Sequence, residues 1–373
     1  MTRGTLLKWH RWAGLIFGVL LLIQGLTGTL LVFRDEIDQL VFPELTVPRV
    51  ANPIPIEQLT QAVTAARPGA QLQRIEFPAV ATQAAIFRLK DADGEPAILA
   101  ADVGTGTVVR QGGLSSWPSE WVFHLHDQLL AGKIGDWIVG IEGIVLVFML
   151  ITGPIVWWPG RKRLKSGFRV IADSGTDRLV RTLHRSAGAI LAVGLLVSSF
   201  TGVFMIFKAD LAPALGTVTK LVPKPSPKVE VREGVAYRPL DMIVASARAS
   251  HGATPLRELR FTGKAGQVVA VYLQDEGSLR VNATKQIHFN RYTGAELGSY
   301  VPSTLPAGSN FFDWLFPIHT GQAIGLTGRL LILCHGLGLV FFAASGIWIW
   351  ISARNKKRAA QAKRAARMTA EMA

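Results

Sequence analysis

The feature of this sequence that most constrains its fold is a set of four apolar stretches, each long enough to span a lipid bilayer. They lie at residues 12–33, 136–158, 186–207 and 327–352 of the 373-residue chain. Each contains about 20 or more mostly apolar residues, which is the length that a hydrocarbon core of about 30 Å requires. The sequence therefore predicts an α-helical membrane protein with four transmembrane helices.

The first apolar stretch is predicted to be a retained helix and not a cleaved signal peptide. Its apolar core is longer than the roughly 7–15 residues of a signal peptide. The charged run RDEID at residues 34–38 follows it, where a cleavage site would have small residues.

The basic residues of the chain, which give it a formal net charge of +14, gather on one side of the predicted membrane helices. They precede the first and third stretches and follow the second and fourth. Short cytoplasmic segments of membrane proteins carry such an excess of lysine and arginine. We therefore expect a multi-pass protein of the bacterial inner membrane, with both termini cytoplasmic and no nucleic-acid partner.

The order of segments follows from these assignments. It is a first transmembrane helix (1–33), an exterior domain (34–135), a second transmembrane helix (136–158), a basic cytoplasmic loop (159–185), a third transmembrane helix (186–207), an exterior domain (208–326), a fourth transmembrane helix (327–352) and a basic cytoplasmic tail (353–373). In each exterior domain an amphipathic helix pattern precedes alternating apolar runs that indicate strands. We therefore expect an α+β domain with a small antiparallel sheet in each, both facing the periplasm.

The two halves of the chain resemble each other, and the repeat includes two pairs of histidines. His10 in LLKWHRWAG recurs as His184 in VRTLHRSAG, 174 residues later. His126 in EWVFHLHDQ recurs as His319 in DWLFPIHTG, 193 residues later. Other positions that match at these offsets are Gly14/Gly188, Thr27/Thr201, Gly28/Gly202, Gly143/Gly336 and Gly153/Gly346. The four transmembrane helices are therefore expected to form two repeated halves.

Paired imidazoles on membrane helices are the arrangement that a bis-histidine haem requires. His10 and His184 border the first and third stretches on the cytoplasmic side, and each has an arginine beside it, Arg11 or Arg185, that can pair with a haem propionate. Small residues one and two turns later on the same helix face would leave flat space for a porphyrin; they are Gly14, Gly18, Gly188 and Ala192. The alternative is that these small residues serve close helix packing and that the polar residues are interfacial.

A second group of candidate ligands lies near the opposite boundary of the membrane. His126 and His319 precede the second and fourth stretches within aromatic segments, where an aromatic belt with incidental histidines is the alternative. His335 lies inside the fourth stretch, about 12 Å deep at 1.5 Å per residue. We expect an outer haem to take two of these three histidines, with His124 as a hydrogen-bonding neighbour.

Glu142 is the counterpart of His335 in the second stretch. Ionisable residues at membrane depth are functional candidates by default. The carboxyl of Glu142 would support the imidazole of His335 as a hydrogen-bonding neighbour, or the two residues would form a proton route.

The cofactors are expected to be two b-type haems. The chain has a single cysteine, Cys334, and no CxxCH motif for covalent haem attachment. It also has no GxGxxG motif, and its cytoplasmic loop is too short for a nucleotide-binding domain. The electrons would therefore come from a separate donor, either an electron donor protein or a quinol.

The sequence resembles the PepSY-associated transmembrane family, in which helix–sheet domains are inserted between membrane helices. The resemblance covers nearly the whole chain and rests on Trp9-His10-Arg11 with Gly14, on His126, on Thr182-Leu183-His184-Arg185, on Ile318-His319-Thr320-Gly321 and on Gly346-Ile347-Trp348. Members of this family include inner-membrane haem proteins of the ferrioxamine-reductase kind, which reduce ferric siderophores. The resemblance implies a periplasmic site for the ferric complex and a haem chain that crosses the bilayer.

The sequence as a whole predicts a di-haem oxidoreductase that passes electrons across the membrane to a ferric siderophore or another ferric chelate, whose reduction frees iron for uptake. Two alternatives remain at this point. The PepSY-like domains could bind a peptide, a protease or another envelope partner without enzymatic activity, with the histidines structural. Glu142 and His335 could instead serve a proton-coupled transporter.

Overall fold

The computed structural model describes residues 2–173, 175–280 and 282–372, which divide into two compact units. The helical unit consists of Met1–Val32, Phe123–Ala209 and Ile318–Ala373. The sheet unit consists of Phe33–Val122 and Asp210–Pro317. Each unit is therefore assembled from segments that are distant in the sequence.

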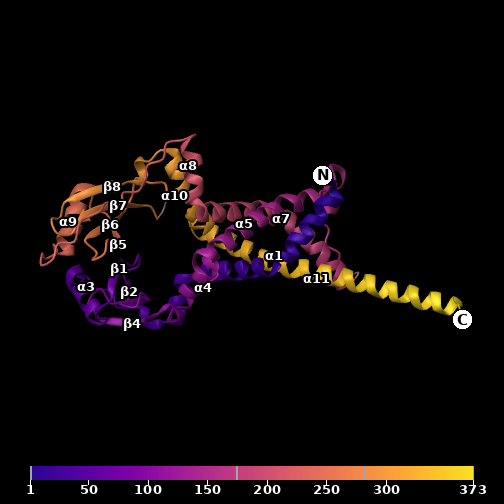
Figure 1. The fold of residues 1–373 in the computed structure, drawn as a ribbon, viewed down its shortest axis with the longest axis horizontal. Coiled ribbons are helices and arrows are strands. Elements are labelled where there is room, and N and C mark those ends of the chain that lie inside the picture. The colour runs from indigo at the N-terminus through magenta and orange to yellow at the C-terminus, as the bar shows by residue number, and fades with distance from the viewer. Residues whose placement is uncertain (1, 174, 281, 373) are drawn as a thin grey trace. The chain divides into compact units, whose positions relative to one another are not determined.

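The helical unit is built on long apolar helices (Figure 1). They are α1 (Arg3–Leu31), α5 (Gly132–Trp157), α7 (Thr176–Ile206) and α11 (Gly325–Met372). Within the described residues these four helices are long and apolar enough to cross a membrane, in agreement with the sequence-based prediction. Helix α1 packs against α11 and α5, and α7 packs against the same two helices, so the four form a closed ring.

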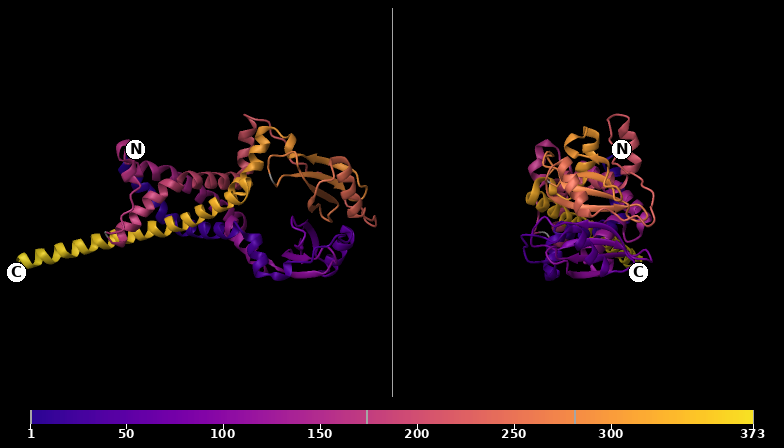
Figure 2. Two further views of the ribbon diagram at one scale, coloured as in Figure 1. Left: turned by 180° about the vertical axis from the view of Figure 1, so that it is seen from behind. Right: turned by 90° about the vertical axis from the view of Figure 1, so that its left-hand side faces the viewer.

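The helices extend beyond the apolar stretches that predict them. Helix α1 begins at Arg3 and α7 at Thr176, so that His10 and His184 lie inside these helices and not at their ends. Helix α11 continues through the basic tail, and its C-terminal part extends past the other three helices (Figures 1 and 2). The tail from residue 353 is rich in alanine, lysine and arginine and has no glycine or proline, so nothing in its composition ends the helix.

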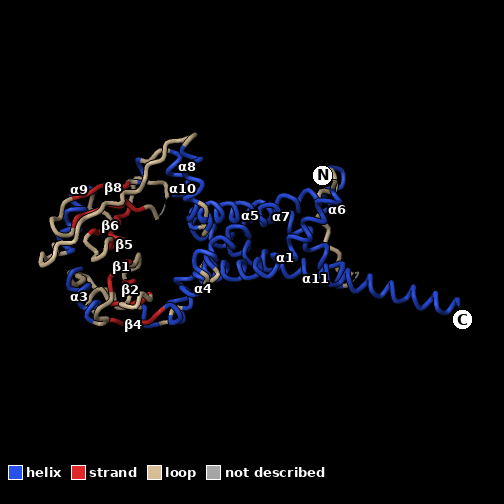
Figure 3. The backbone as a smooth tube through the Cα atoms, in the orientation of Figure 1, coloured by secondary structure: helices blue, strands red, loops and turns tan. Residues whose placement is uncertain are grey.

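Shorter helices occupy the connections between these elements (Figure 3). They are α2 (Arg34–Val41), α3 (Ile56–Ala65), α4 (Pro118–Gln128), α6 (Leu164–Gly167), α8 (Lys208–Gly216), α9 (Leu240–His251) and α10 (Ala307–His319). Helices α4 and α10 carry His126 and His319, as the sequence predicts for the aromatic segments at these positions.

The sheet unit contains one antiparallel sheet to which both exterior segments contribute. The first segment supplies β1 (Gln71–Glu76), β2 (Ala85–Lys90), β3 (Pro96–Ala101) and β4 (Val108–Gly113), and the second supplies β5 (Leu256–Thr262), β6 (Val268–Gln274), β7 (Thr284–Asn290) and β8 (Glu296–Tyr300). The strand order within the described residues is β4-β3-β2-β1-β5-β6-β7-β8. The sequence predicts a separate small sheet in each exterior domain; the structure instead joins the strands of both segments into one sheet.

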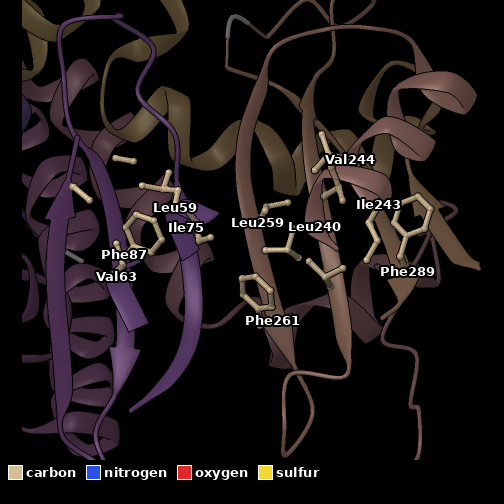
Figure 4. Packing of buried hydrophobic residues seen from close by; sticks show 14 of the residues in the cluster. Leu59, Val63, Ile75, Phe87, Leu240, Ile243, Val244, Leu259, Phe261 and Phe289 are labelled. Atoms are coloured by element: carbon tan, nitrogen blue, oxygen red, sulfur yellow. The ribbon is translucent and has the colours of Figure 1, made fainter. Parts of the chain in front are cut away.

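The two segments join because β1 and β5 share a buried face. Ile75 of β1 stands opposite Leu259 of β5, and both side chains are fully buried. Helices α3 and α9 cover this face and form one core with the strands, to which Leu59, Phe87 and Ile243 belong (Figure 4). Neither β1 nor β5 is then left as an exposed edge, which would be open to pairing with another chain.

The opposite face of the sheet combines a small apolar cluster around Ile98 and Trp117 with charged residues that bond the start of α4. On this face Arg88 of β2 bonds Glu76 at 2.9 Å and Glu120 of α4 at 2.7 Å. Burial would raise the pKa of Glu76, but Arg88 and Arg74 lower it below its usual value. The corresponding acidic residue of α10, Asp313, accepts a hydrogen bond from the Tyr300 hydroxyl of β8 at 3.1 Å. Glu120 in the first turn of α4 and Asp313 in the second turn of α10 thus fix these two helices to the sheet.

Candidate functional site

Four of the six histidines that the sequence singles out form two pairs in the helical unit. The first pair, His10 of α1 and His184 of α7, is called here the His10 pair. The second, His126 of α4 and His319 of α10, is called the His126 pair.

A cavity of about 390 Å³ contains both members of the His10 pair. Residues from α1, α5, α7 and α11 line it, and apolar side chains make up most of the wall. Ligand-binding cavities usually combine such apolar walls with a few precisely placed polar groups. Here the polar groups are the two imidazoles together with Arg11, Arg181 and Arg185, which can balance the negative charge of an anionic ligand.

Three of the four predicted small residues lie in the wall of this cavity. They are Gly14, Gly188 and Ala192. Gly18 is not among the residues that line it, because this part of α1 faces Ile347 of α11 at van der Waals distance. For Gly18 the structure therefore supports the helix-packing interpretation.

Each imidazole of the His10 pair is held through its Nδ1 atom by a hydroxyl on a neighbouring helix. The Nδ1 of His10 lies 3.1 Å from the Thr152 hydroxyl of α5. The Nδ1 of His184 lies 2.7 Å from the Ser345 hydroxyl of α11. A partner at one ring nitrogen orients the ring and determines which nitrogen carries the proton.

The hydroxyl groups determine the tautomer of these histidines. Thr152 donates its one hydroxyl proton to the carbonyl of Phe148 at 2.9 Å, one turn back in its own helix. Ser345 does the same to Phe342 at 3.3 Å. A hydroxyl that gives its one proton to this carbonyl accepts a hydrogen bond from the imidazole, which then carries its proton on Nδ1. The Nε2 atom then keeps the lone pair that a metal ion binds.

The two rings of the His126 pair lie close together. Their centroids are 6.2 Å apart. The Nδ1 of His126 lies 2.9 Å from the Thr27 hydroxyl of α1, and the Nδ1 of His319 lies 3.2 Å from the Thr201 hydroxyl of α7 and 2.9 Å from the Ser198 carbonyl. The carbonyl can only accept, so His319 also carries its proton on Nδ1.

The threonine hydroxyls that bond the His126 pair also donate to backbone carbonyls. Thr27 donates to the carbonyl of Ile23 at 2.7 Å, and Thr201 donates to that of Val197 at 2.9 Å. Burial, together with the neighbouring His319, lowers the pKa of His126 to about 3. Burial lowers the pKa of His319 as well, which favours the neutral form of both rings.

Glycines make room for all four rings. A Cβ on Gly28 would lie 3.0 Å from the Cε1 atom of His126, and one on Gly202 would lie 3.1 Å from that of His319. The His10 pair has Gly153 and Gly346 at the corresponding places, with Cβ distances of 3.4 and 3.7 Å. The glycines that match between the halves of the sequence thus stand where an imidazole edge approaches a helix backbone.

His335 and His124 do not belong to these pairs. The ring of His335 lies directly against Gly194 of α7, where an added Cβ would be only 2.0 Å from its Nε2 atom. Its Nδ1 atom is buried without a hydrogen-bond partner among the described residues. The Nδ1 of His124 instead forms a short hydrogen bond with Gln128 on the same helix. Of the three candidates for an outer site, the structure brings together His126 and His319.

Glu142 is buried inside the helical unit with a relative exposure of 2%. Neither of its carboxyl oxygens has a hydrogen-bond partner among the described residues. Among the described residues it therefore makes no hydrogen bond to a histidine.

Sequence reasoning missed the hydroxyl residues. Thr27 and Thr201 stand out as matched positions at the offset of 174, but this match alone does not indicate which side chain they hold. Thr152 and Ser345 match at the offset of 193 only by chemical type. One signal would have identified all four: at the sequence offsets that relate the paired histidines, both halves of the chain have a serine or a threonine.

Comparison with protein families identifies the chain. The model of the PepSY-associated TM region matches residues 7–353, and the chain belongs to this family. The matched region includes both histidine pairs and their four hydroxyl partners. A comparison with curated proteins gives no significant match.

The contact between His335 and Gly194 gives a first prediction. Gly194→Ala places a methyl group where the His335 ring stands, so α7 and α11 must separate or the ring must move. Overpacking of this kind costs about 1–3 kcal/mol. We expect a lower midpoint of thermal unfolding in detergent for this variant. Gly188→Ala on the same helix is the control, because its Cβ would meet only Phe342 at 3.9 Å. Equal midpoints for the two variants would contradict the packing described here.

Proposed function

We propose that this member of the PepSY-associated TM region family is a b-type di-haem protein that carries electrons through the bacterial inner membrane to a ferric siderophore. The observation that carries the proposal is the geometry of the His126 pair. Its two rings lie 6.2 Å apart, and each is hydrogen-bonded through Nδ1 to a residue of another helix.

The ring spacing would allow His126 and His319 to hold one haem iron between them. A histidine–metal bond is about 2 Å long, and the ligating nitrogen lies about 1 Å from the ring centre. Two such bonds place the ring centroids about 6 Å apart, close to the value for His126 and His319. A porphyrin supplies the other four nitrogens, so two imidazoles are all that the protein has to add.

The cavity around the His10 pair fits a second haem. Small residues widen it beside each histidine, while Arg11 and Arg185 line it and can hold propionates. The hydroxyls of Thr152 and Ser345 orient the imidazoles, the role that hydrogen-bonding neighbours of metal ligands commonly have.

The two pairs are held at levels separated by most of the bilayer thickness. Thr27, which holds His126, follows His10 by 17 residues on α1, and Thr201 follows His184 by 17 residues on α7. At 1.5 Å per residue this is about 25 Å along either helix. Haem at both levels would supply one-electron transfer between ferric and ferrous iron. The residues of the chain bind it, orient it and exclude water from it.

The direction of electron flow is inferred from the charge distribution. The basic residues that flank α1, α5, α7 and α11 favour a cytoplasmic position for the His10 pair and a periplasmic one for the His126 pair and the sheet unit. An electron donor protein or a quinol would deliver electrons to the His10 pair. A ferric siderophore would accept them at the periplasmic side, where reduction weakens iron binding.

The haem content of histidine variants tests both sites. We expect purified protein to show a Soret band and split α and β bands on reduction, from two haems per chain. His10→Ala, His184→Ala, His126→Ala and His319→Ala should each remove about half of the haem, because each iron loses an axial ligand. His335→Ala should retain both haems, and it serves as the matched control.

Two results would reject this assignment. A colourless protein would favour a non-enzymatic envelope-binding scaffold. If His335→Ala loses haem while His126→Ala keeps its full haem content, then His335 and not His126 is a ligand of the second site.

The hydroxyls give a second, independent test of ligand geometry. Thr27→Val keeps the shape of the side chain but leaves the Nδ1–H of His126 without its acceptor. Such changes next to a metal ligand typically lower affinity about 10–100-fold. We expect faster transfer of haem from this variant to excess apomyoglobin. Thr29→Val is the control, since among the described residues the Thr29 hydroxyl bonds the Gly25 carbonyl of its own helix at 2.6 Å and no histidine. Identical transfer rates in the two variants would disprove the role of Thr27.

The reaction is tested by re-oxidation. Dithionite-reduced protein, freed of excess dithionite, should be re-oxidised by a ferric hydroxamate siderophore, with release of ferrous iron to a chelator such as ferrozine. The iron-free siderophore should leave the protein reduced. If the protein binds haem but ferric siderophores do not oxidise it, the two haem sites stand and the ferric siderophore is not the electron acceptor.

A further inference from the structure

Two ionisable side chains inside the helical unit have no part in the histidine pairs. They are Glu142 of α5 and His335 of α11. Glu142 is buried with both carboxyl oxygens unpartnered among the described residues, and His335 has a buried, unpartnered Nδ1 atom. A buried carboxyl without hydrogen bonds costs free energy that a glutamine or a leucine at this place would lessen or avoid. Such a cost points to a function for the carboxyl.

Glu142 lies on α5 close to the cavity of the His10 pair, and its neighbour Gly143 accepts a hydrogen bond from Ser199 of α7. Leu146, one turn further along the same face of α5, lines the cavity of the His10 pair. In the other direction, ten residues separate Glu142 from Gly132 at the start of α5. The carboxyl is therefore one helical turn from the cavity wall and inside the apolar part of the helix.

His335 occupies the corresponding level on α11. Leu339, one turn away, also lines the cavity. The Gly194 that contacts His335 is one turn from Ser198, whose carbonyl accepts the hydrogen bond of His319. Glu142 and His335 therefore each lie one helical turn from a residue that lines the cavity of the His10 pair.

Few other charges act on Glu142. The two helices that pack against α5 are α1 and α7, and residues 12–33 and 186–207 of these contain no ionisable side chain. On α11, residues 330–352 contain Cys334 and His335. On α5 itself the other carboxylate is Asp136, which is part of an ion pair with Lys133 near the start of the helix. Glu142 is therefore the acidic side chain that a change of charge inside the helical unit would affect most.

We propose that Glu142 takes up a proton when the helical unit gains an electron and releases it when the electron leaves. The inference rests on the proposed function, because it requires a bound redox centre. An electron from a one-electron donor adds one negative charge to an apolar interior, where charges interact more strongly than in water. One proton from water converts the Glu142 carboxylate to the acid, and the net charge of the bundle is unchanged.

Glu142 suits this role better than His335. Neither of its two oxygens has a hydrogen-bond partner in the part of the chain that the structure describes, so protonation breaks no hydrogen bond there. The Nε2 side of His335 is covered by the backbone of α7 at Gly194, which leaves its ring little room to gain a proton there. His335 is therefore the alternative proton acceptor, and the experiment compares it with Glu142.

The test is a redox titration of the purified, haem-loaded full-length protein in detergent between pH 5.5 and 8.5. We expect the midpoint potential of at least one haem to fall as the pH rises, with a slope approaching that of one proton per electron. That slope is a tenfold change in the equilibrium constant per pH unit, or 59 mV for a one-electron couple. Glu142→Gln should keep both haems and abolish this dependence.

Two control variants separate the outcomes. Asp136→Asn removes a carboxylate from the same helix near its end and should leave the pH dependence as in the wild type. His335→Gln should also leave it unchanged. If the slope is lost in His335→Gln and kept in Glu142→Gln, the proton belongs to His335 and the proposal is overturned.

A spectroscopic readout identifies the group directly. The reduced-minus-oxidised infrared difference spectrum of the wild type should contain a carboxylic acid C=O band that Glu142→Gln lacks. Bound haem with a pH-independent potential and no such band would refute the proton uptake while leaving the proposed function intact. Absence of haem would instead refute the proposed function and, with it, this inference.

Discussion

The hydrogen bond from a histidine Nδ1 to a hydroxyl on another helix is the interaction on which the arrangement of the candidate site depends. It joins α1 to α5 through Thr152, α7 to α11 through Ser345, α4 to α1 through Thr27, and α10 to α7 through Thr201. Each hydroxyl gives its own proton to the helix backbone, so it can only accept from the ring. One contact thus orients the imidazole, selects its tautomer and ties two helices together.

Close helix packing makes these contacts possible. At Gly25 a Cβ would lie 3.0 Å from the backbone nitrogen of Val340, so α1 and α11 approach each other backbone to backbone. On the other side of the ring of helices, the Ser199 hydroxyl of α7 donates to the Gly143 carbonyl of α5 at 2.9 Å. Membrane helices associate largely through such small residues and interhelical hydrogen bonds, because their surfaces gain nothing from leaving lipid. The same small residues leave space beside the histidines.

Much of this organisation could be predicted from the sequence because it depends on local pattern. The apolar stretches predicted the long helices, and the amphipathic pattern at 54–70 predicted α3. Gly106 and Gly294, which end turns after β3 and β7, have a positive φ of 76° and 75°, a conformation that glycine adopts readily. The repeat of two halves stays a prediction. The union of β1 with β5 could not be predicted, since alternating apolar residues indicate a buried face but not the strand that lies beside it.

The sequence by itself determined the membrane-spanning helices, the family and the four paired histidines, because hydropathy and residue type are properties of each segment alone. Only the tertiary structure decided that His126 faces His319, that His335 is packed against Gly194 and that Glu142 is left without a partner. The reason is geometric. Which face of a helix meets which neighbour depends on packing between segments far apart in the chain, and imidazoles close in membrane depth can be joined or separated by the rotation of a helix about its axis.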